Sequence, residues 1–147
     1  MQTFLMYKSS KENPNYAEIV KTLNKTIVRL DYKRLGKQRV EAMQIIDIHE
    51  GRSSSSAWVN HPAVKMWKDN IECLKLYYNL CINEWMNRGY TNTMIKYDID
   101  ENKVSLPDWL TKEFIDSHRS NLLRKYFSYY KQFNWNVPDN LPYVWPK

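Results

Sequence analysis

Apolar residues recur at helical spacing over most of this chain, and the clearest run follows Asn60-His61-Pro62. Proline near a first turn is a start signal for a helix, and Gly89 after Arg88 is a stop signal. Between these signals, seven apolar residues alternate at steps of three and four: Val64, Trp67, Ile71, Leu74, Tyr78, Cys81 and Trp85. The pattern predicts one central helix from Pro62 to Arg88, about 40 Å long at ~1.5 Å per residue.

The same periodicity indicates helices elsewhere in the chain. An apolar stripe predicts a helix over residues 13–30, and a second helix follows over residues 32–49. Asp31 stands where its side chain would cap that second helix. Helix resumes near Asp108 and extends to about Phe133, with or without a break.

The connections between these helices carry turn and breaker residues. Residues 51–56, with a glycine and a run of serines, predict a mobile loop. Residues 91–106 fit either a loop or a short extended pair. Residues 137–146 contain Pro138, Pro142 and Pro146, so this tail cannot form a regular helix. Its aromatic residues predict that it packs across the domain.

These elements define the expected fold. The chain has only three glycines and long periodic segments, which favour helices. Its 147 residues are enough for one hydrophobic core. We therefore expect an all-α protein: a compact single-domain helical bundle over residues 1–147, with one long central helix and a proline-punctuated C-terminal tail.

Charge narrows the class of partner. Lys and Arg number 22 against 16 Asp and Glu, and the sequence pI is about 9.2. A basic balance favours a polyanion such as DNA, RNA or an anionic membrane surface. The N-terminus lacks the apolar core of a signal peptide, and no stretch approaches the ~18 apolar residues of a membrane span. We expect an intracellular monomer that uses no membrane.

The two cysteines indicate a reducing compartment. If Cys73 and Cys81 share one helix, their Cα atoms are about 12 Å apart at ~1.5 Å per residue. A disulfide needs less than ~7 Å, so both are expected to be free thiols. Two cysteines and three scattered histidines also make no metal cluster, and no metal or other cofactor is expected.

A first basic segment covers residues 33–39, with four cations and no acid. On a helical wheel, Lys33, Arg34 and Lys37 share the outward arc with Glu41. Such a row suits a phosphate backbone, although a solvated helix face would look the same. Arg39 falls within the apolar arc, which favours a buried or snorkelling side chain paired with an acid.

Two other segments are candidates for nucleic-acid contact. Residues 118–131 interleave cations, hydroxyls and aromatics, which can hold phosphates and stack on bases, or form core. His61 follows Asn60 at a helix start, where it fits either a phosphate or sugar contact or a capping role. The candidate DNA-binding residues are Lys33, Arg34, Arg39, Asn60, His61, His118, Arg119, Ser120, Asn121, Arg124 and Lys125.

Six sequence blocks, in order along the chain, resemble one known family. They are MQTFL at residues 1–5, LDYKRLGKQRVEA at 30–42, NHPAVKMW at 60–67, NRGY at 87–90, HRSNLLRK at 118–125 and NLPYVWP at 140–146. The family is that of the pyrimidine-dimer DNA glycosylases with abasic-site lyase activity. The resemblance implies an all-helical enzyme that acts on double-stranded DNA, bends it and flips a nucleotide at a UV-induced dimer or related altered pyrimidine.

The resemblance also implies a mechanism. An N-terminal amine attacks C1′ of the sugar, an imine forms, and β-elimination nicks the strand, while a carboxylate from the second helix stabilises the sugar cation. An α-amine has a pKa near ~8 against ~10.4 for lysine, so more of it is unprotonated at neutral pH. Imine chemistry needs no metal or cofactor.

The chain departs from the family pattern at two positions. Gln2 stands where the best-understood members have a small residue, and it ordinarily leaves Met1 in place. The nucleophile would then be the Met1 amine or Lys37, which has cationic neighbours. The carboxylate would be Asp31 or Glu41, and we prefer Glu41 because Asp31 suits a cap. Two other functions stay open: a non-catalytic DNA- or RNA-binding module, and a glycosylase for another modified base.

Overall fold

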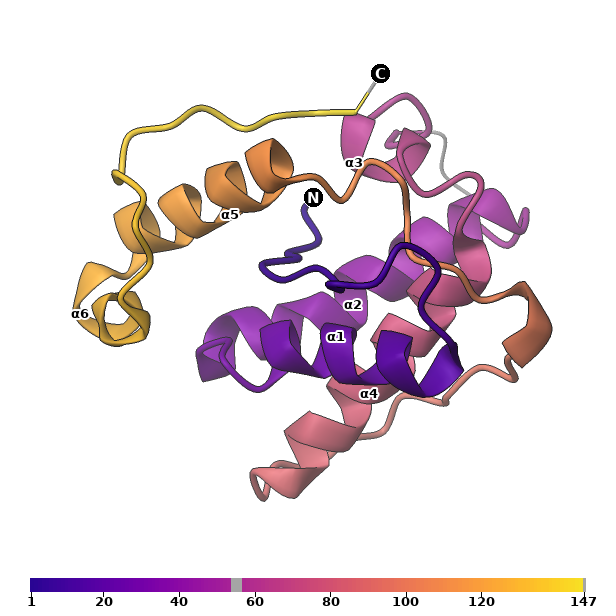
Figure 1. Cartoon of the computed structure of the whole chain (residues 1–147). Coiled ribbons are helices and arrows are strands. Elements are labelled where there is room, and N and C mark those ends of the chain that lie inside the picture. The colour runs from indigo at the N-terminus through magenta and orange to yellow at the C-terminus, as the bar shows by residue number, and fades with distance from the viewer. Residues whose placement is uncertain (54–56, 147) are drawn as a thin grey trace.

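All regular secondary structure in the residues described by this computed structural model, 1–53 and 57–146, is helical (Figure 1). The elements are α1 (Tyr16–Ile27), α2 (Tyr32–His49), α3 (Pro62–Lys65), α4 (Ile71–Asn87), α5 (Lys112–Lys125), α6 (Phe127–Tyr130) and the 3-10 turns η1 (Glu101–Lys103) and η2 (Lys131–Phe133). The predicted all-α class is confirmed.

Side-chain caps explain where two of the helices begin. The Asn15 side chain accepts from the backbone N–H of Glu18 at 2.9 Å, and the Glu18 carboxylate accepts from that of Asn15 at 3.0 Å. This reciprocal box starts α1. The Thr111 hydroxyl accepts a backbone N–H of the first turn of α5. The helix predicted over residues 108–133 is thus shortened at its start and broken at Tyr126.

The helix predicted over residues 62–88 is wrong as a single element, because it is divided into α3 and α4. The backbone between them turns through short-range bonds such as Asn70 N–H to the Trp67 carbonyl at 2.9 Å. The Trp67 indole donates to the Thr3 hydroxyl at 3.0 Å and packs edge-on against Trp109. Apolar spacing correctly places Trp67 in the core. It does not report whether the backbone is continuous.

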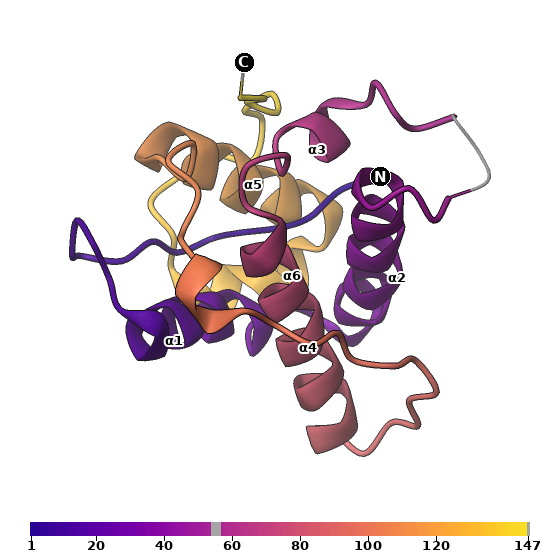
Figure 2. The ribbon, with the colours of Figure 1, turned by 90° about the vertical axis from the view of Figure 1, so that its right-hand side faces the viewer.

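Both chain ends pack against α5. The N-terminal segment passes between α5 on one side and α1 and α2 on the other (Figures 1 and 2). The C-terminal tail runs along α5, where Leu141 N–H donates to Ser120 Oγ at 2.9 Å and Val144 N–H to Ser117 Oγ at 3.3 Å. The prediction that the tail packs across the domain is confirmed.

The cysteines and the loops complete the described fold. Cys73 and Cys81 are buried free thiols, as predicted. Residues 91–100 are a loop without regular structure, the first of the two alternatives for that segment. Residues 54–56 of the predicted mobile loop lie outside the described residues. Among the helices of the described part, none is both long and apolar enough to cross a bilayer.

Candidate functional site

A pocket of about 390 Å³ brings together the N-terminal segment, α2, the end of α5 and the C-terminal tail. Its lining residues are Met1, Gln2, Phe4, Lys33, Arg34, Lys37, Gln38, Glu41, Lys125 and Tyr143. The two basic segments of the sequence therefore meet at one site, with the start of the chain at the same place. We call this the basic pocket.

Glu41 is the acid of the basic pocket. Its Oε2 accepts from the backbone N–H of Gln2 at 2.9 Å and lies 3.5 Å from Gln38 Nε2. Burial raises the pKa of the Glu41 carboxyl, against the opposing effects of the Gln2 hydrogen bond and of the charges of the Met1 amine, Lys37 and Lys125. A partly desolvated carboxylate thus lies beside the N-terminal amine.

Cations surround this acid. Lys33, Lys37 and Lys125 are exposed at the pocket, where they are free to meet an anion. Arg34 is held more firmly, because its Nη1 lies 3.2 Å from both carboxylate oxygens of Asp31. Four positive side chains from two helices therefore converge on one opening.

Asp31 occupies the cap position of α2, but its side chain makes no capping hydrogen bond. The prediction that its side chain caps the helix is therefore wrong. The buried carboxylate instead accepts from the Tyr130 hydroxyl at 2.5 Å and pairs with Arg34. A buried charge needs such partners, and here they hold the Arg34 guanidinium at the basic pocket.

Side chains rather than a neighbouring strand hold the N-terminal segment in place. The Gln38 carboxamide accepts from Phe4 N–H at 2.9 Å and donates to the Gln2 carbonyl at 2.9 Å. The Tyr77 hydroxyl lies 2.7 Å from Gln38 Oε1 and 2.9 Å from the Phe4 carbonyl. These bonds determine which residue of the segment lies beside Glu41.

His118 was predicted to contact DNA, but it is fully buried. Its Nδ1 accepts from Leu5 N–H at 3.4 Å, and its Nε2 lies 3.1 Å from the Gln2 side chain. Burial lowers the pKa of His118 to about 3, so the ring is neutral at physiological pH. We assign it to positioning the N-terminal segment.

Other residues of the second basic segment bond to the two chain ends or within α5. Ser120 and Asn121 are buried, with Ser120 bonded to the C-terminal tail and Asn121 donating to a carbonyl of α5 at 2.7 Å. The Arg119 guanidinium donates to the Met6 carbonyl at 3.0 Å. Arg124 donates to tail carbonyls but stays exposed. Of these four candidates, Arg124 offers the most surface to a phosphate.

The remaining candidates lie outside the basic pocket. His61 Nδ1 accepts from Ala63 N–H at 3.0 Å, which is the capping alternative. Asn60 is exposed beside it, on a larger and more apolar pocket of about 880 Å³. Among the described residues Arg39 forms no ion pair; its guanidinium instead donates to Asn92 at 2.6 Å and lies 4.3 Å from the Trp85 ring centre. The predicted acid–Arg39 pair is therefore wrong.

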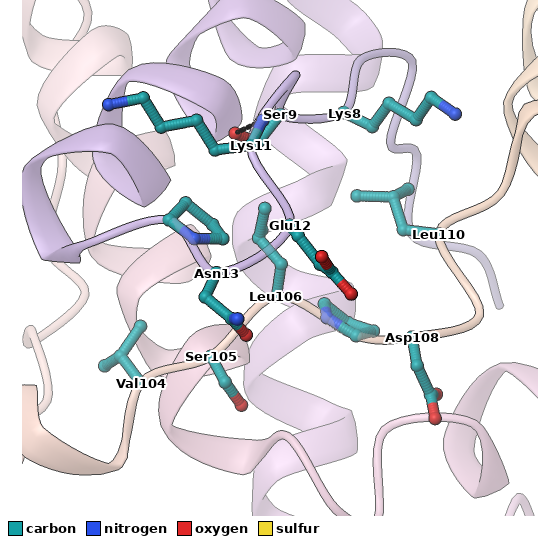
Figure 3. A pocket seen from close by; sticks show the side chains of 12 residues that line it. Lys8, Ser9, Lys11, Glu12, Asn13, Val104, Ser105, Leu106, Asp108 and Leu110 are labelled. Atoms are coloured by element: carbon teal, nitrogen blue, oxygen red, sulfur yellow. Dashed lines mark hydrogen bonds between the residues drawn. The ribbon is translucent and has the colours of Figure 1, made fainter.

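A third pocket, also about 390 Å³, lies between the segments 8–14 and 104–110 (Figure 3). Its charged side chains are of both signs, and those of Lys8 and Lys11 extend in opposite directions. None of the residues selected from the sequence lines it. The basic pocket therefore remains the candidate site.

Sequence reasoning missed Gln38, Tyr77 and Tyr143 at or beside the site. A signal for Gln38 was present, since it lies on the same arc of α2 as the buried Leu35 and Ala42. A polar side chain on an apolar arc must find hydrogen-bond partners inside the protein. Tyr77 and Tyr143 carried no comparable signal, because their roles depend on distant segments.

An all-α domain with a cationic pocket around one desolvated carboxylate has the features of a protein that acts on a polyanion. The sequence model of the family described as pyrimidine dimer DNA glycosylase matches residues 15–98, more than half of the chain, and the chain belongs to that family. The family implies a DNA substrate. No curated protein and no solved structure matches the chain.

Proposed function

We propose that this protein excises a damaged pyrimidine from double-stranded DNA and then nicks the abasic strand through an imine. Glu41 acts as the carboxylate and the Met1 amine as the nucleophile. The observation that supports this assignment is the position of Glu41, half-buried and hydrogen-bonded to the residue that follows Met1. The family match includes Glu41 and supports a DNA glycosylase in general.

The proposed reaction proceeds through a covalent bond between the amine and C1′ of the sugar. The amine lone pair forms a bond to C1′, and the glycosidic bond breaks with its electron pair leaving on the base. The C1′–O4′ bond then opens to give a protonated imine. Removal of a C2′ proton expels the 3′ phosphate, and water hydrolyses the imine to restore the amine. Glu41 stabilises the cationic sugar and moves protons, for which a raised pKa suits a carboxylate near neutral pH.

Lys37 is the alternative nucleophile, since it also lines the basic pocket. We prefer the Met1 amine because the Glu41 carboxylate is hydrogen-bonded, at 2.9 Å, to the backbone N–H of the next residue, Gln2. An α-amine also has more of its population unprotonated at neutral pH than an ordinary lysine.

The exposed cations would hold the DNA backbone. Lys33, Lys37 and Lys125 line the opening, and Arg34 is fixed among them by Asp31. Phosphate contacts of this kind give salt-dependent binding. Extrusion of the nucleotide then brings C1′, which is closed to attack within a base stack, into the pocket.

Borohydride trapping tests the proposal. Wild-type protein is mixed with a duplex that carries an abasic site, and borohydride reduces any imine to a stable protein–DNA bond. Peptide mapping of the adduct should find the DNA on Met1, and a two-residue N-terminal extension should abolish it. An adduct on Lys37 would replace the nucleophile, while no adduct where a known lyase gives one would overturn the imine mechanism.

A lesion panel tests the substrate. Duplexes that carry a pyrimidine dimer, an oxidised pyrimidine or an undamaged thymine are compared for release of the base. We expect release from the dimer duplex and none from the undamaged one. Release only from another altered base would assign the enzyme to that base, and binding without release from any would leave a DNA-binding module.

A further inference from the structure

The N-terminal segment is extended but has no strand partner among the described residues. Its backbone groups from Gln2 to Met6 are bonded instead by side chains of four helices: Thr26 of α1, Gln38 and Glu41 of α2, Tyr77 of α4, and His118 and Arg119 of α5. The register of the segment therefore depends on individual side chains, and a change in register would move the chain terminus.

Gln38 has a special place among these side chains. It is 1% exposed, and its carboxamide contacts two residues of the segment as well as Glu41. With the Tyr77 hydroxyl, it has partners for both lone pairs of its oxygen and for both hydrogens of its nitrogen. Gln38 thus links the start of the chain directly to the acid of the basic pocket.

The backbone of the N-terminal segment determines which way the carboxamide faces. The Phe4 N–H can only donate, so it requires the Gln38 oxygen, and the Gln2 carbonyl can only accept, so it requires the nitrogen. The fully buried Tyr77 hydroxyl lies 2.7 Å from the same Oε1 and 2.9 Å from the Phe4 carbonyl, and so supports this arrangement. The nitrogen then faces the Gln2 carbonyl and Glu41. A reversed amide would lose the bonds to both Phe4 N–H and the Gln2 carbonyl.

We propose that Gln38, supported by the Tyr77 hydroxyl, is a positioning residue that sets the N-terminal amine against Glu41. This inference rests on the proposed amine mechanism and adds residues to which that mechanism assigns no role. Gln38 need not touch the DNA. It acts through the segment, because a displacement of about 1 Å between reacting groups can lower a rate by ~100-fold.

Single-turnover trapping separates positioning from folding and from DNA binding. In Gln38→Met, a variant of similar length without hydrogen-bonding groups, the rate of borohydride trapping should fall by about tenfold or more. The dissociation constant for the same duplex, measured without borohydride, should stay within about twofold because the exposed cations are unchanged. The matched control is Gln44→Met, an exposed glutamine of the same helix, which should trap at the wild-type rate.

Tyr77→Phe provides the milder variant in case Gln38→Met does not fold. It keeps the buried ring and removes the hydroxyl, so it should fold and trap more slowly than wild type by about three- to tenfold. Wild-type trapping rates in the folded variants would overturn the positioning role, and so would loss of DNA affinity equal to the loss of rate. Failure of the wild-type protein itself to trap would instead refute the amine mechanism.

Discussion

The backbone N–H of Gln2 donates to the Glu41 carboxylate at 2.9 Å across 39 positions of sequence. This bond joins the start of the chain to the middle of α2 and places an amine beside a carboxylate in a cationic pocket. In the proposed mechanism the amine and the carboxylate act on the same sugar, so their separation has to be controlled. Gln38 and Tyr77 are placed to control it.

Glu41→Gln should fold as wild type does but form the imine adduct much more slowly. The carboxamide oxygen can still accept from Gln2 N–H, but it cannot move a proton or balance a cationic sugar. We expect trapping on an abasic duplex to slow by about 100-fold or more, the usual range for a lost acid–base group. A gel assay measures the adduct. Trapping at the wild-type rate would show that another group carries this role.

The same substitution should alter how stability depends on pH. Burial raises the pKa of Glu41 in the folded state, so the folded protein holds this proton more tightly than the unfolded chain. The charged carboxylate therefore lowers stability once the pH rises above ~4.3, the pKa of glutamate in the unfolded chain. The loss is complete above the folded-state pKa. Thermal melts should show the melting temperature of Glu41→Gln rising relative to that of wild type as the pH rises through this window. A gap that is constant with pH would contradict the prediction.

His118 should make the fold sensitive to acid. Its pKa is lowered to about 3 from 6.5, so between these pH values the unfolded chain binds a proton on this ring and the folded protein does not. The stability that His118 contributes is complete above pH 6.5 and is lost as the pH falls toward 3. Denaturant titrations between these limits should show a shallower loss in His118→Gln. Equal slopes for the two proteins would place the acid sensitivity elsewhere.

Tyr130→Phe should destabilise the protein through Asp31. The substitution removes the hydroxyl that donates to a buried carboxylate and leaves that charge with fewer partners. Loss of such a bond costs about 1–3 kcal/mol in the free energy of unfolding, measured with urea. Tyr129→Phe, on the ring packed edge-on against Tyr130, is the matched control and should cost less. Equal costs would mean that the Tyr130–Asp31 bond contributes no more to stability than the Tyr129 hydroxyl does.

Lys125→Gln should weaken DNA binding in a salt-dependent way. If Lys125 neutralises one phosphate, its loss lowers the slope of log K against log salt by about 0.9. Lys103→Gln, in η1 and 74% exposed, is the control because Lys103 does not line the basic pocket. Fluorescence anisotropy with one duplex at several salt concentrations measures both slopes. An unchanged slope for Lys125→Gln would remove Lys125 from the DNA surface.

The helix positions and the inward faces could largely be predicted from sequence. The predicted range of α2, residues 32–49, matches the structure, and the apolar stripe that contains Trp67 is buried. Periodicity is a local property, since each turn of a helix repeats the same geometry. The break between α3 and α4 could not be predicted, because Thr3 and Trp109 hold it from distant parts of the chain.

The charged residues of the candidate site could be predicted from sequence, but the exposure of the other candidate residues could not. The row Lys33, Arg34, Lys37 and Glu41 lies on one arc of α2 and does line one pocket. His118, Ser120 and Asn121 were chosen for their chemistry alone, and the fold buries them. Residue type shows what a side chain can do, whereas exposure depends on which other segments cover it.

The sequence alone therefore determined the helical class, the cationic arc of α2 and the family resemblance, all of which follow from local spacing and residue type. Only the tertiary structure decided that the chain terminus lies beside Glu41 and that Asp31 pairs with Arg34. It also decided that Gln38 contacts both the N-terminal segment and Glu41. The physical reason is that hydrogen bonds and desolvation depend on atoms brought together by folding, over separations at which sequence spacing carries no distance information.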